Sequence, residues 1–249
     1  MREKLTVIVP GLNEESSVEA TVEEILSVAE TLPVETRILM IDDGSSDRTR
    51  EVMEGIARRH PNCSVLANDR NLGVGRSVLN AYRQLEKGTW ACVAPADNEI
   101  DFRSIRNLLA IREDHDLVLG YLQNPIIRPF PRRLASAAFT RTVNLVFGFW
   151  FRYLNGLKLY RVEIFQGLEV VSGGHAFNAE LIAKALLRKP DLRIGEAPFI
   201  ARGRARGSSK AFSLRGVLRA VWEVVVGYRS TARFRDDVIR GLTVDTSTK

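Results

Sequence analysis

Short apolar runs alternate with amphipathic segments along the first half of the chain. The apolar runs cover residues 5–9, 37–41, 64–67, 90–94 and 117–120. Apolar residues recur with helical spacing from Ser17 to Leu32, from Thr49 to Arg59 and after the glycine turn at 71–75. Strands that alternate with helices in this way predict a parallel sheet with right-handed crossovers. We therefore expect an α/β fold with a mostly parallel sheet flanked by helices.

Polar clusters follow three of the predicted strands. They read PGLNE at 10–14, DDGSSD at 42–47 and PADNE at 95–99. Ligands of open parallel sheets bind beyond the carboxyl ends of the strands. One such cluster is typical of an ordinary loop, but three at successive strand ends predict a single ligand crevice.

The second half of the chain has a different pattern of side chains. Residues 132–160 mix aromatic residues with arginines, and a second amphipathic stretch runs from Leu214 to Tyr228. These helices could lie at a membrane interface with arginines at the headgroups, or they could be ordinary core-facing helices. The longest apolar stretch, Leu145 to Phe151, is far shorter than the roughly 18–20 residues that span a bilayer, so no spanning helix is expected.

Composition narrows the class of protein. The 249 residues, 45% hydrophobic and 27% charged, exclude a disordered or collagen-like chain. Two cysteines, Cys63 and Cys92, cannot build a disulfide framework, which favours a reducing compartment. The first apolar run ends at a proline after five residues, so we interpret it as a strand rather than a signal peptide and expect a cytoplasmic protein. We expect one domain over residues 1–230 and a polar, mobile tail over 231–249.

The net charge of +6 is concentrated near the C-terminus. Residues 188–249 hold 14 Lys and Arg against 6 Asp and Glu, a surplus of 8, which leaves −2 for residues 1–187. This surplus indicates an anionic partner such as a phosphate or a lipid surface, or else a solvated basic face. No recognition helix or aromatic RNA-binding platform is evident, so nucleic acid is not an expected partner.

Carboxylates at strand ends suit two kinds of chemistry. They accept hydrogen bonds from a ribose or a base, a role that fits Asp42 and Asp43. They also hold a hard cation, Mg²⁺ or Mn²⁺, which needs oxygen ligands and keeps substrate phosphates in its remaining positions. Asp97 and Glu99 fit that second role.

Five motifs give the chain a family resemblance. They are VIVPGLNEE (7–15), IDDGSSDRT (41–49), NLGVGRS (71–77), APADNE (94–99) and RARGSSK (204–210). The chain resembles the family 2 glycosyltransferases of Rossmann-like GT-A fold, in particular the dolichol-phosphate mannosyltransferase and polyprenol-phosphate glycosyltransferase branch. The resemblance implies an inverting, metal-dependent hexosyltransferase that moves a sugar from a nucleotide-sugar donor to polyprenyl phosphate, peripheral at the inner, cytoplasmic face of the membrane.

Alternatives stay open at this point. A transferase of the same family could act on a polysaccharide, a lipid-linked saccharide or a protein. A non-catalytic relative could keep only the nucleotide-sugar pocket. The sugar, the base and the oligomeric state are not determined by the sequence.

The resemblance also implies roles for individual residues. The donor pocket would include Pro10, Leu12, Glu14, Asp42, Asp43, Gly73, Arg76, Ala96 and Asp97. Asp97 and Glu99 would hold the metal, and Asp97, Arg204 and Lys210 would be catalytic. Arg133, Ser136, Arg204 and Ser209 would contact the acceptor phosphate.

Several positions depart from the family pattern. Its D-x-D motif is here Pro95-Ala96-Asp97, so the first carboxylate is missing, and Arg76 would replace the charge of a lysine that is Val74 here. We interpret His175 as a candidate for a direct role. Glu180 could lie below the acceptor site, or it could be a carboxylate at a helix N-terminus that the helix dipole favours. For Glu196 we expect a structural role.

Overall fold

The computed structural model describes residues 3–174, 176–202 and 214–241, and within them seven strands form one sheet. The strands are β1 (Lys4–Gly11), β2 (Glu35–Asp42), β3 (Cys63–Ala67), β4 (Trp90–Val93), β5 (Leu117–Leu122), β6 (Lys158–Arg161) and β7 (Ile194–Phe199). Their order in the sheet is β3-β2-β1-β4-β6-β5-β7. Every pairing is parallel except those of β6, which is antiparallel to β4 and β5. The predicted mostly parallel α/β sheet is confirmed.

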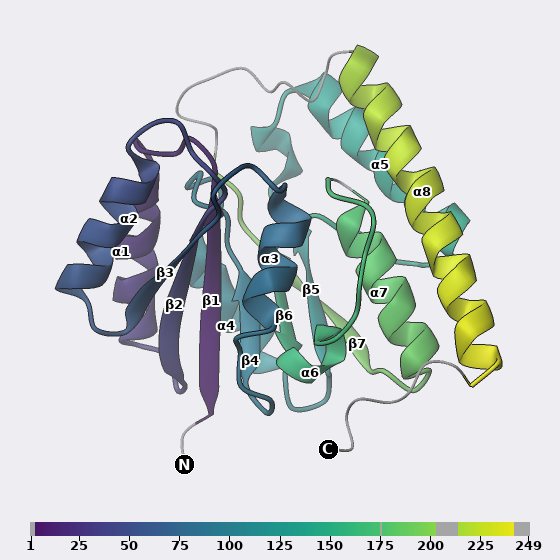
Figure 1. Ribbon diagram of the computed structural model, residues 1–249, viewed down its shortest axis with the longest axis horizontal. Coiled ribbons are helices and arrows are strands. Elements are labelled where there is room, and N and C mark those ends of the chain that lie inside the picture. The colour runs from purple at the N-terminus through teal and green to yellow at the C-terminus, as the bar shows by residue number, and fades with distance from the viewer. Residues whose placement is uncertain (1–2, 175, 203–213, 242–249) are drawn as a thin grey trace.

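Helices cover both faces of the sheet (Figure 1). On one face lie α1 (Val18–Ala29), α2 (Thr49–Arg59) and α4 (Ile105–Ala110), next to the 3₁₀ turn η1 (Phe102–Ser104). On the other lie α3 (Val74–Tyr82), α6 (Val162–Phe165) and α7 (Phe177–Arg188). Outside α7, at the right of Figure 1, lie α5 (Phe130–Phe147), which follows the turn η2 (Pro125–Ile127), and α8 (Leu214–Ile239).

The core lies in two layers because the central strands are buried on both faces. Leu5, Val7 and Val9 of β1 pack toward α1, whereas Ile8 faces the opposite cluster. Strands buried on both faces read as continuous apolar runs, which is why these segments were recognisable in the sequence. Both cysteines are buried and free.

The structure corrects the predicted organisation of the second half. The helical part of the stretch 132–160 belongs to α5, which ends at Phe147; Gly148 follows with a φ of +72°, which suits glycine, and the chain then continues to β6. The predicted boundary at residue 231 lies inside α8, which continues to Ile239. Phe234 of that extension packs against the core, and the Lys184 ammonium lies 5.7 Å from its ring.

Residues 242–249, the rest of the predicted tail, lie outside the described part of the chain. Among the helices that are described, none is both long and apolar enough to cross a membrane.

Candidate functional site

The three polar strand ends meet at one edge of the sheet. The amide of Asp43 donates to the Gly11 carbonyl at 3.0 Å, and the amide of Ala96 donates to the Pro10 carbonyl at 3.0 Å. Asn13 accepts a hydrogen bond from the Ser46 amide at 2.8 Å. These contacts join the ends of β1, β2 and β4, so the predicted convergence of the three clusters is confirmed.

The two neighbouring aspartates at the end of β2 have different surroundings. Asp43 accepts four hydrogen bonds, from Asn68 Nδ2, Ser77 Oγ and the amides of Leu72 and Gly73, at 2.7–3.0 Å. Within the described part of the chain, Asp42 accepts one hydrogen bond, from the Ser45 amide to Oδ1 at 3.1 Å. Asp43 therefore holds the start of α3 in place, and Asp42 is the better candidate for contact with a ligand.

The remaining predicted donor residues surround the same edge. Pro10 and Ala96 are buried backbone positions, whereas Leu12 and Arg76 present exposed side chains. Glu14 accepts a hydrogen bond from Ser17 Oγ at 2.6 Å. Gly73 has a φ of +85°, a left-handed conformation that glycine adopts without strain.

The turn after β4 carries the predicted metal ligands. Asp97 Oδ1 accepts the Glu99 amide at 3.1 Å, and Asn98 between them has a φ of +55°. Glu99 is buried, and its Oε2 lies 3.0 Å from Nη2 of Arg132 on α5. The turn thus carries two carboxylates, and that of Glu99 is paired with Arg132.

The donor atoms at this turn fit a hard divalent cation only in part. No group of three or more His, Cys, Asp or Glu side chains suited to a metal occurs in the described ranges. Mg²⁺ commonly uses one or two carboxylates together with substrate phosphates. Asp97 meets that minimum, and Arg132 competes with a metal for Glu99.

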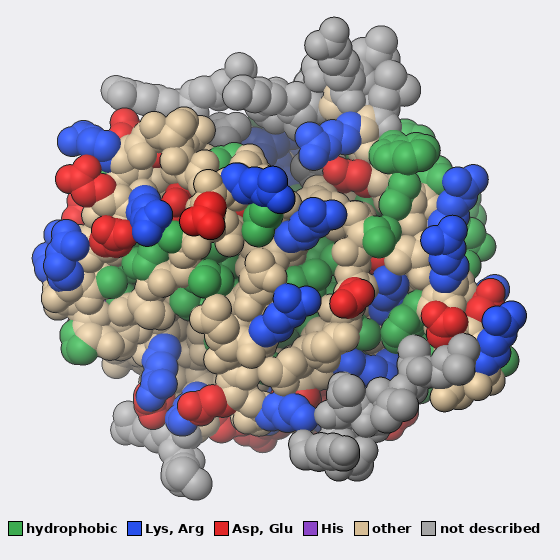
Figure 2. Space-filling view, viewed as in Figure 1, with side chains coloured by type: hydrophobic (Ala, Val, Ile, Leu, Met, Phe, Trp, Pro, Cys, Tyr) green, Lys and Arg blue, Asp and Glu red, His purple; other side chains and the backbone are tan. Residues whose placement is uncertain are grey.

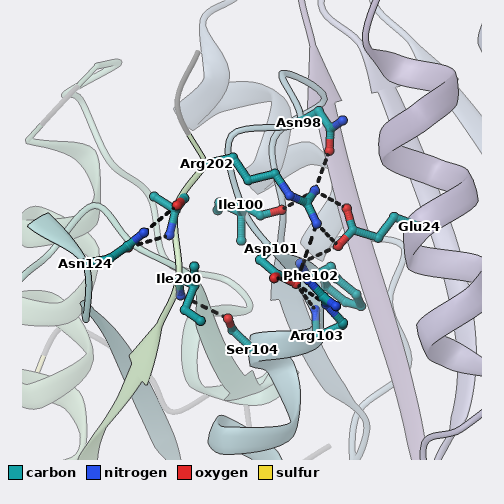
Figure 3. Close-up of polar contacts among 11 residues, drawn as sticks. Glu24, Asn98, Ile100, Asp101, Phe102, Arg103, Ser104, Asn124, Ile200 and Arg202 are labelled. Carbon is teal, nitrogen blue, oxygen red and sulfur yellow. Dashed lines mark hydrogen bonds and ion pairs between the residues drawn. The ribbon is translucent and has the colours of Figure 1, made fainter. Parts of the chain in front are cut away.

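A partly buried arginine, Arg202, holds this turn through hydrogen bonds (Figure 3). Arg202 donates through Nη1 to Asn98 Oδ1 at 2.9 Å and through Nη2 to Glu24 Oε1 at 2.6 Å, and Nη1 also contacts Glu24 Oε2. The amide of Arg202 donates to the Glu99 carbonyl at 2.7 Å. Its hydrogen bonds to Glu24 raise the pKa of Arg202. Sequence analysis missed this positioning residue, although it stands just before the RARGSSK motif.

Four predicted residues cannot be located. Arg204, Ser209 and Lys210 of the RARGSSK motif, and His175, lie outside the described residues. Their roles remain predictions.

A large cavity of about 920 Å³ opens beside the turn that carries Asp97 and Glu99, which we call the metal turn after its predicted ligands. Asp97 and Glu99 stand at one part of its wall, and α3, α5, α7, α8 and the β4–β6 face of the sheet enclose the rest. Most of the lining is apolar; its polar and charged side chains include Arg128, Arg132, Ser136, Asn155, Lys158 and Asn178. This arrangement suits an elongated amphiphile.

The predicted acceptor residues are only partly brought to this cavity. Ser136 lines it, whereas Arg133 is exposed and is not among the described lining residues. Its neighbour Arg132 lines the cavity instead. The phase of α5 turns Arg132 toward the cavity and Arg133 toward the surface. The contact of Arg133 with an acceptor phosphate stays a prediction.

Glu180 belongs to a buried network below the cavity. It accepts hydrogen bonds from Ser172 Oγ at 2.5 Å and from Lys184 Nζ at 2.8 Å. Burial alone raises the pKa of Glu180, but the hydrogen bonds from Lys184 and Ser172 outweigh it and hold the pKa below its usual range. These contacts favour a structural role, as does the acceptance of the Arg152 amide by Glu196 at 2.8 Å.

Comparison with known proteins places this site in context. Residues 6–184 match the family model described as glycosyl transferase family 2. The chain is 26% identical over 216 residues to the dodecaprenyl-phosphate galacturonate synthase of Rhizobium johnstonii, covering 83% of this chain and 61% of that protein. It is 25% identical over 219 residues to the dolichol-phosphate mannosyltransferase of Saccharomyces cerevisiae, covering 82% of this chain and 80% of that protein.

Solved structures share the fold. Glucosyl-3-phosphoglycerate synthase from Mycobacterium tuberculosis, in complex with Mn²⁺, UDP and phosphoglyceric acid, superposes with a TM-score of 0.62 at 18% identity over 90% of this chain and 79% of that one. A mannosyltransferase from Pyrobaculum calidifontis, in complex with GDP-Man and Mn²⁺, superposes with a TM-score of 0.66 at 16% identity. The match covers 94% of this chain and 65% of that one. The expected GT-A fold is confirmed, and the match over most of its length shows that this chain belongs to glycosyltransferase family 2.

Proposed function

We propose that this protein is an inverting glycosyltransferase that moves a sugar from a nucleotide-sugar donor to polyprenyl phosphate at the cytoplasmic surface of a membrane. One observation carries the proposal: the polar ends of β1, β2 and β4 and the large, mostly apolar cavity share the turn that bears Asp97. A polar donor and an amphiphilic acceptor would therefore meet at this carboxylate. The names of the relatives, which include two prenyl-phosphate sugar transferases, support the acceptor class.

The donor would lie along the edge formed by β1, β2 and β4. Asp42 would accept hydrogen bonds from its ribose or base, and Leu12 would pack against the nucleoside. Asp97 would hold Mg²⁺ or Mn²⁺, with Glu99 as the second candidate ligand. When bound, the cation would neutralise the charge that develops on the leaving diphosphate.

The reaction that this geometry favours needs no protein base. A phosphate oxygen of the acceptor attacks the anomeric carbon and forms the new C–O bond. The bond from that carbon to the donor diphosphate breaks, and the nucleoside diphosphate leaves with the electron pair. Because the attacking oxygen is already deprotonated, no histidine or carboxylate has to remove a proton.

Exposed apolar side chains surround the cavity helices and support contact with a membrane. They include Ile126, Phe130, Leu134, Leu145 and Trp150 from the η2 to α5 region, and Val221, Trp222 and Tyr228 on α8. Arginines lie among them on α8, where Figure 2 shows basic and hydrophobic side chains together at the right-hand edge. Such a surface favours reversible binding to anionic lipid.

The test is a transfer assay with purified protein, Mn²⁺ and radiolabelled UDP-, GDP- or dTDP-sugars. We expect label to appear in polyprenyl phosphate, and not in the polyprenol that lacks the phosphate. Label in a polysaccharide, lipid-linked saccharide or peptide would identify a different acceptor. Donor binding without transfer to any acceptor would favour the non-catalytic alternative, for which the proline at position 95 in place of a carboxylate is the motivating feature.

A further inference from the structure

A buried lysine lies in the wall of the apolar cavity. Lys158 is the first residue of β6, is only 8% exposed and lines the cavity together with Tyr160 of the same strand. Its Nζ donates to the Gly156 carbonyl at 2.8 Å. No carboxylate of the described residues lies within ion-pairing distance of this ammonium group. Lys184, which is also buried, is by contrast paired with Glu180.

This location is unfavourable for folding. A buried ammonium group that is satisfied by a single carbonyl keeps much of its desolvation penalty, because nothing neutralises its charge. Burial lowers the pKa of Lys158 to about 8, so that the side chain is still mainly protonated at neutral pH. An apolar side chain of similar length would fit the surrounding wall at lower cost. A charge retained at such a place needs a reason outside the folding of the free protein.

The surroundings indicate what would neutralise the charge. Asn155 and Asn178, hydrogen-bonded to each other at 3.0 Å, line the cavity near the start of β6. Antiparallel pairing of β6 with β4 puts Lys158 at the end of β4 that leads to Asp97. Away from this polar end the walls are apolar, with Val78 on α3, Leu181 on α7 and Val224 on α8. The cavity is thus polar and cationic near the metal turn and apolar elsewhere.

We propose that Lys158 is a direct ligand of the acceptor's phosphate group and selects a prenyl phosphate over the corresponding alcohol. The inference rests on the proposed function and adds to it a residue and an orientation: phosphate toward β6, hydrocarbon between α3, α7 and α8. Phosphate supplies the charge that the fold leaves uncompensated, and an ammonium group binds it through charge-assisted hydrogen bonds. A phosphate bound to Lys158 would lie at the end of the cavity that is next to Asp97.

The test compares binding of farnesyl phosphate with binding of farnesol, so that no sugar transfer is required. We expect the wild type to bind farnesyl phosphate about 10- to 100-fold more tightly than farnesol, as the loss of a charge-assisted contact suggests. Lys158→Met and Lys158→Gln should bring this ratio close to one while leaving farnesol binding unchanged. The matched control Lys189→Met, a half-exposed lysine that does not line the cavity, should keep the wild-type ratio.

The outcomes separate this inference from the proposed function. A wild type without phosphate preference, or a Lys158→Met variant that keeps it, would overturn the inference even if transfer to polyprenyl phosphate is observed. A phosphate preference that depends on Lys158 would support the inference even if no transfer occurs, in which case only the proposed function fails. Binding of Mn²⁺ and a nucleoside diphosphate by both variants at wild-type affinity would show that the donor edge is intact.

Discussion

The edge at the ends of β1, β2 and β4, proposed to bind the donor and called the donor edge here, differs from the cavity proposed to bind the acceptor in how its polar groups are satisfied. At the donor edge, Asp43 alone accepts four hydrogen bonds, and short backbone contacts join the ends of β1, β2 and β4. In the cavity, Lys158 is buried with one carbonyl partner, and most of the wall is apolar. The donor edge is thus organised before any ligand binds, whereas the cavity holds space and a charge that suit a ligand. Five experiments test this contrast.

The largest effect is expected at the point that both regions share. Asp97→Asn should lower kcat by about 1,000-fold, since the variant loses the charge that would hold the metal and the leaving diphosphate. Initial rates with labelled donor measure this effect, and Asp191→Asn, an exposed aspartate far along the chain, is the control. Calorimetry should also show that Mn²⁺ no longer strengthens nucleoside diphosphate binding. Equal metal enhancement in the variant would contradict the role of Asp97.

The two aspartates at the end of β2 should separate stability from binding. Asp43→Asn places an NH₂ group among four donors, so we expect the free energy of unfolding to fall by about 2–4 kcal/mol. Asp42→Asn keeps an oxygen for the Ser45 amide and should change stability by less than about 1 kcal/mol, but it should weaken nucleotide binding. Urea denaturation and calorimetry measure the two quantities. Weaker nucleotide binding in Asp43→Asn, together with lower stability in Asp42→Asn, would show that Asp43 is the ligand-binding residue.

Loosening the support of the metal turn should cost activity. Glu24→Gln removes the charge that fixes Arg202, and we expect kcat to fall about 10- to 50-fold because Asp97 and Glu99 are then less well positioned. Glu23→Gln, its exposed neighbour on α1, is the matched control. An unchanged kcat in Glu24→Gln would mean that the turn keeps its shape without the Arg202 pair.

The buried lysine should make stability depend on pH in a defined direction. The pKa of Lys158 is about 8 in the folded chain against an ordinary value of 10.5, so below pH 8 both folded and unfolded states are protonated and the burial penalty is fully present. Between pH 8 and 10.5 the unfolded state binds more protons, and stability rises with pH. Lys158→Met should therefore be more stable than the wild type at pH 7 by on the order of 1–3 kcal/mol, a difference that shrinks toward pH 10.5.

Melting curves across this pH range measure the effect, with Lys189→Met as the control. Burial raises the pKa of Tyr82, Tyr160 and Cys92, that of Cys92 to about 12, so these groups lower the stability of the folded state as the pH rises above their ordinary values. Wild type and variant share these three groups, and their contribution cancels in the difference between the two proteins. A Lys158→Met protein that is less stable than the wild type at pH 7 would show that the ammonium group stabilises the fold.

The smallest effect is expected at the membrane surface. Trp222→Ala removes a side chain that is 63% exposed on α8, and we expect binding to anionic vesicles to weaken about threefold. Flotation with liposomes at low salt measures it, and neutral vesicles are the control. Failure of the wild type to float with anionic vesicles would contradict membrane association altogether.

The donor edge could be predicted from the sequence because its signals are local. Apolar runs followed by Asp42, Gly73 or Asp97 place these residues at strand ends or helix starts whatever lies elsewhere in the chain. The same logic gave α2 with its bounds and β1 to within two residues.

The cavity and the contacts that hold the turn after β4 could not be predicted in this way, because their residues depend on packing between distant parts of the chain. Arg202 meets Glu24 across 178 positions, which no spacing rule connects. Lys158 reads as an ordinary charged residue until β6 is inserted between β4 and β5. Whether Arg132 or Arg133 faces inward is decided by one helical step of 100°, finer than the pattern along α5 could settle.

The reversed direction of β6 has an evolutionary consequence. Because this strand alone runs against its neighbours, its first residues, rather than its last, border the edge where the nucleotide motifs lie. The stretch from 149 to 158 can therefore diverge without shifting the register of β1, β2 and β4. Substitutions in this stretch would therefore reshape the wall of the cavity, while the ends of β1, β2 and β4 keep their geometry.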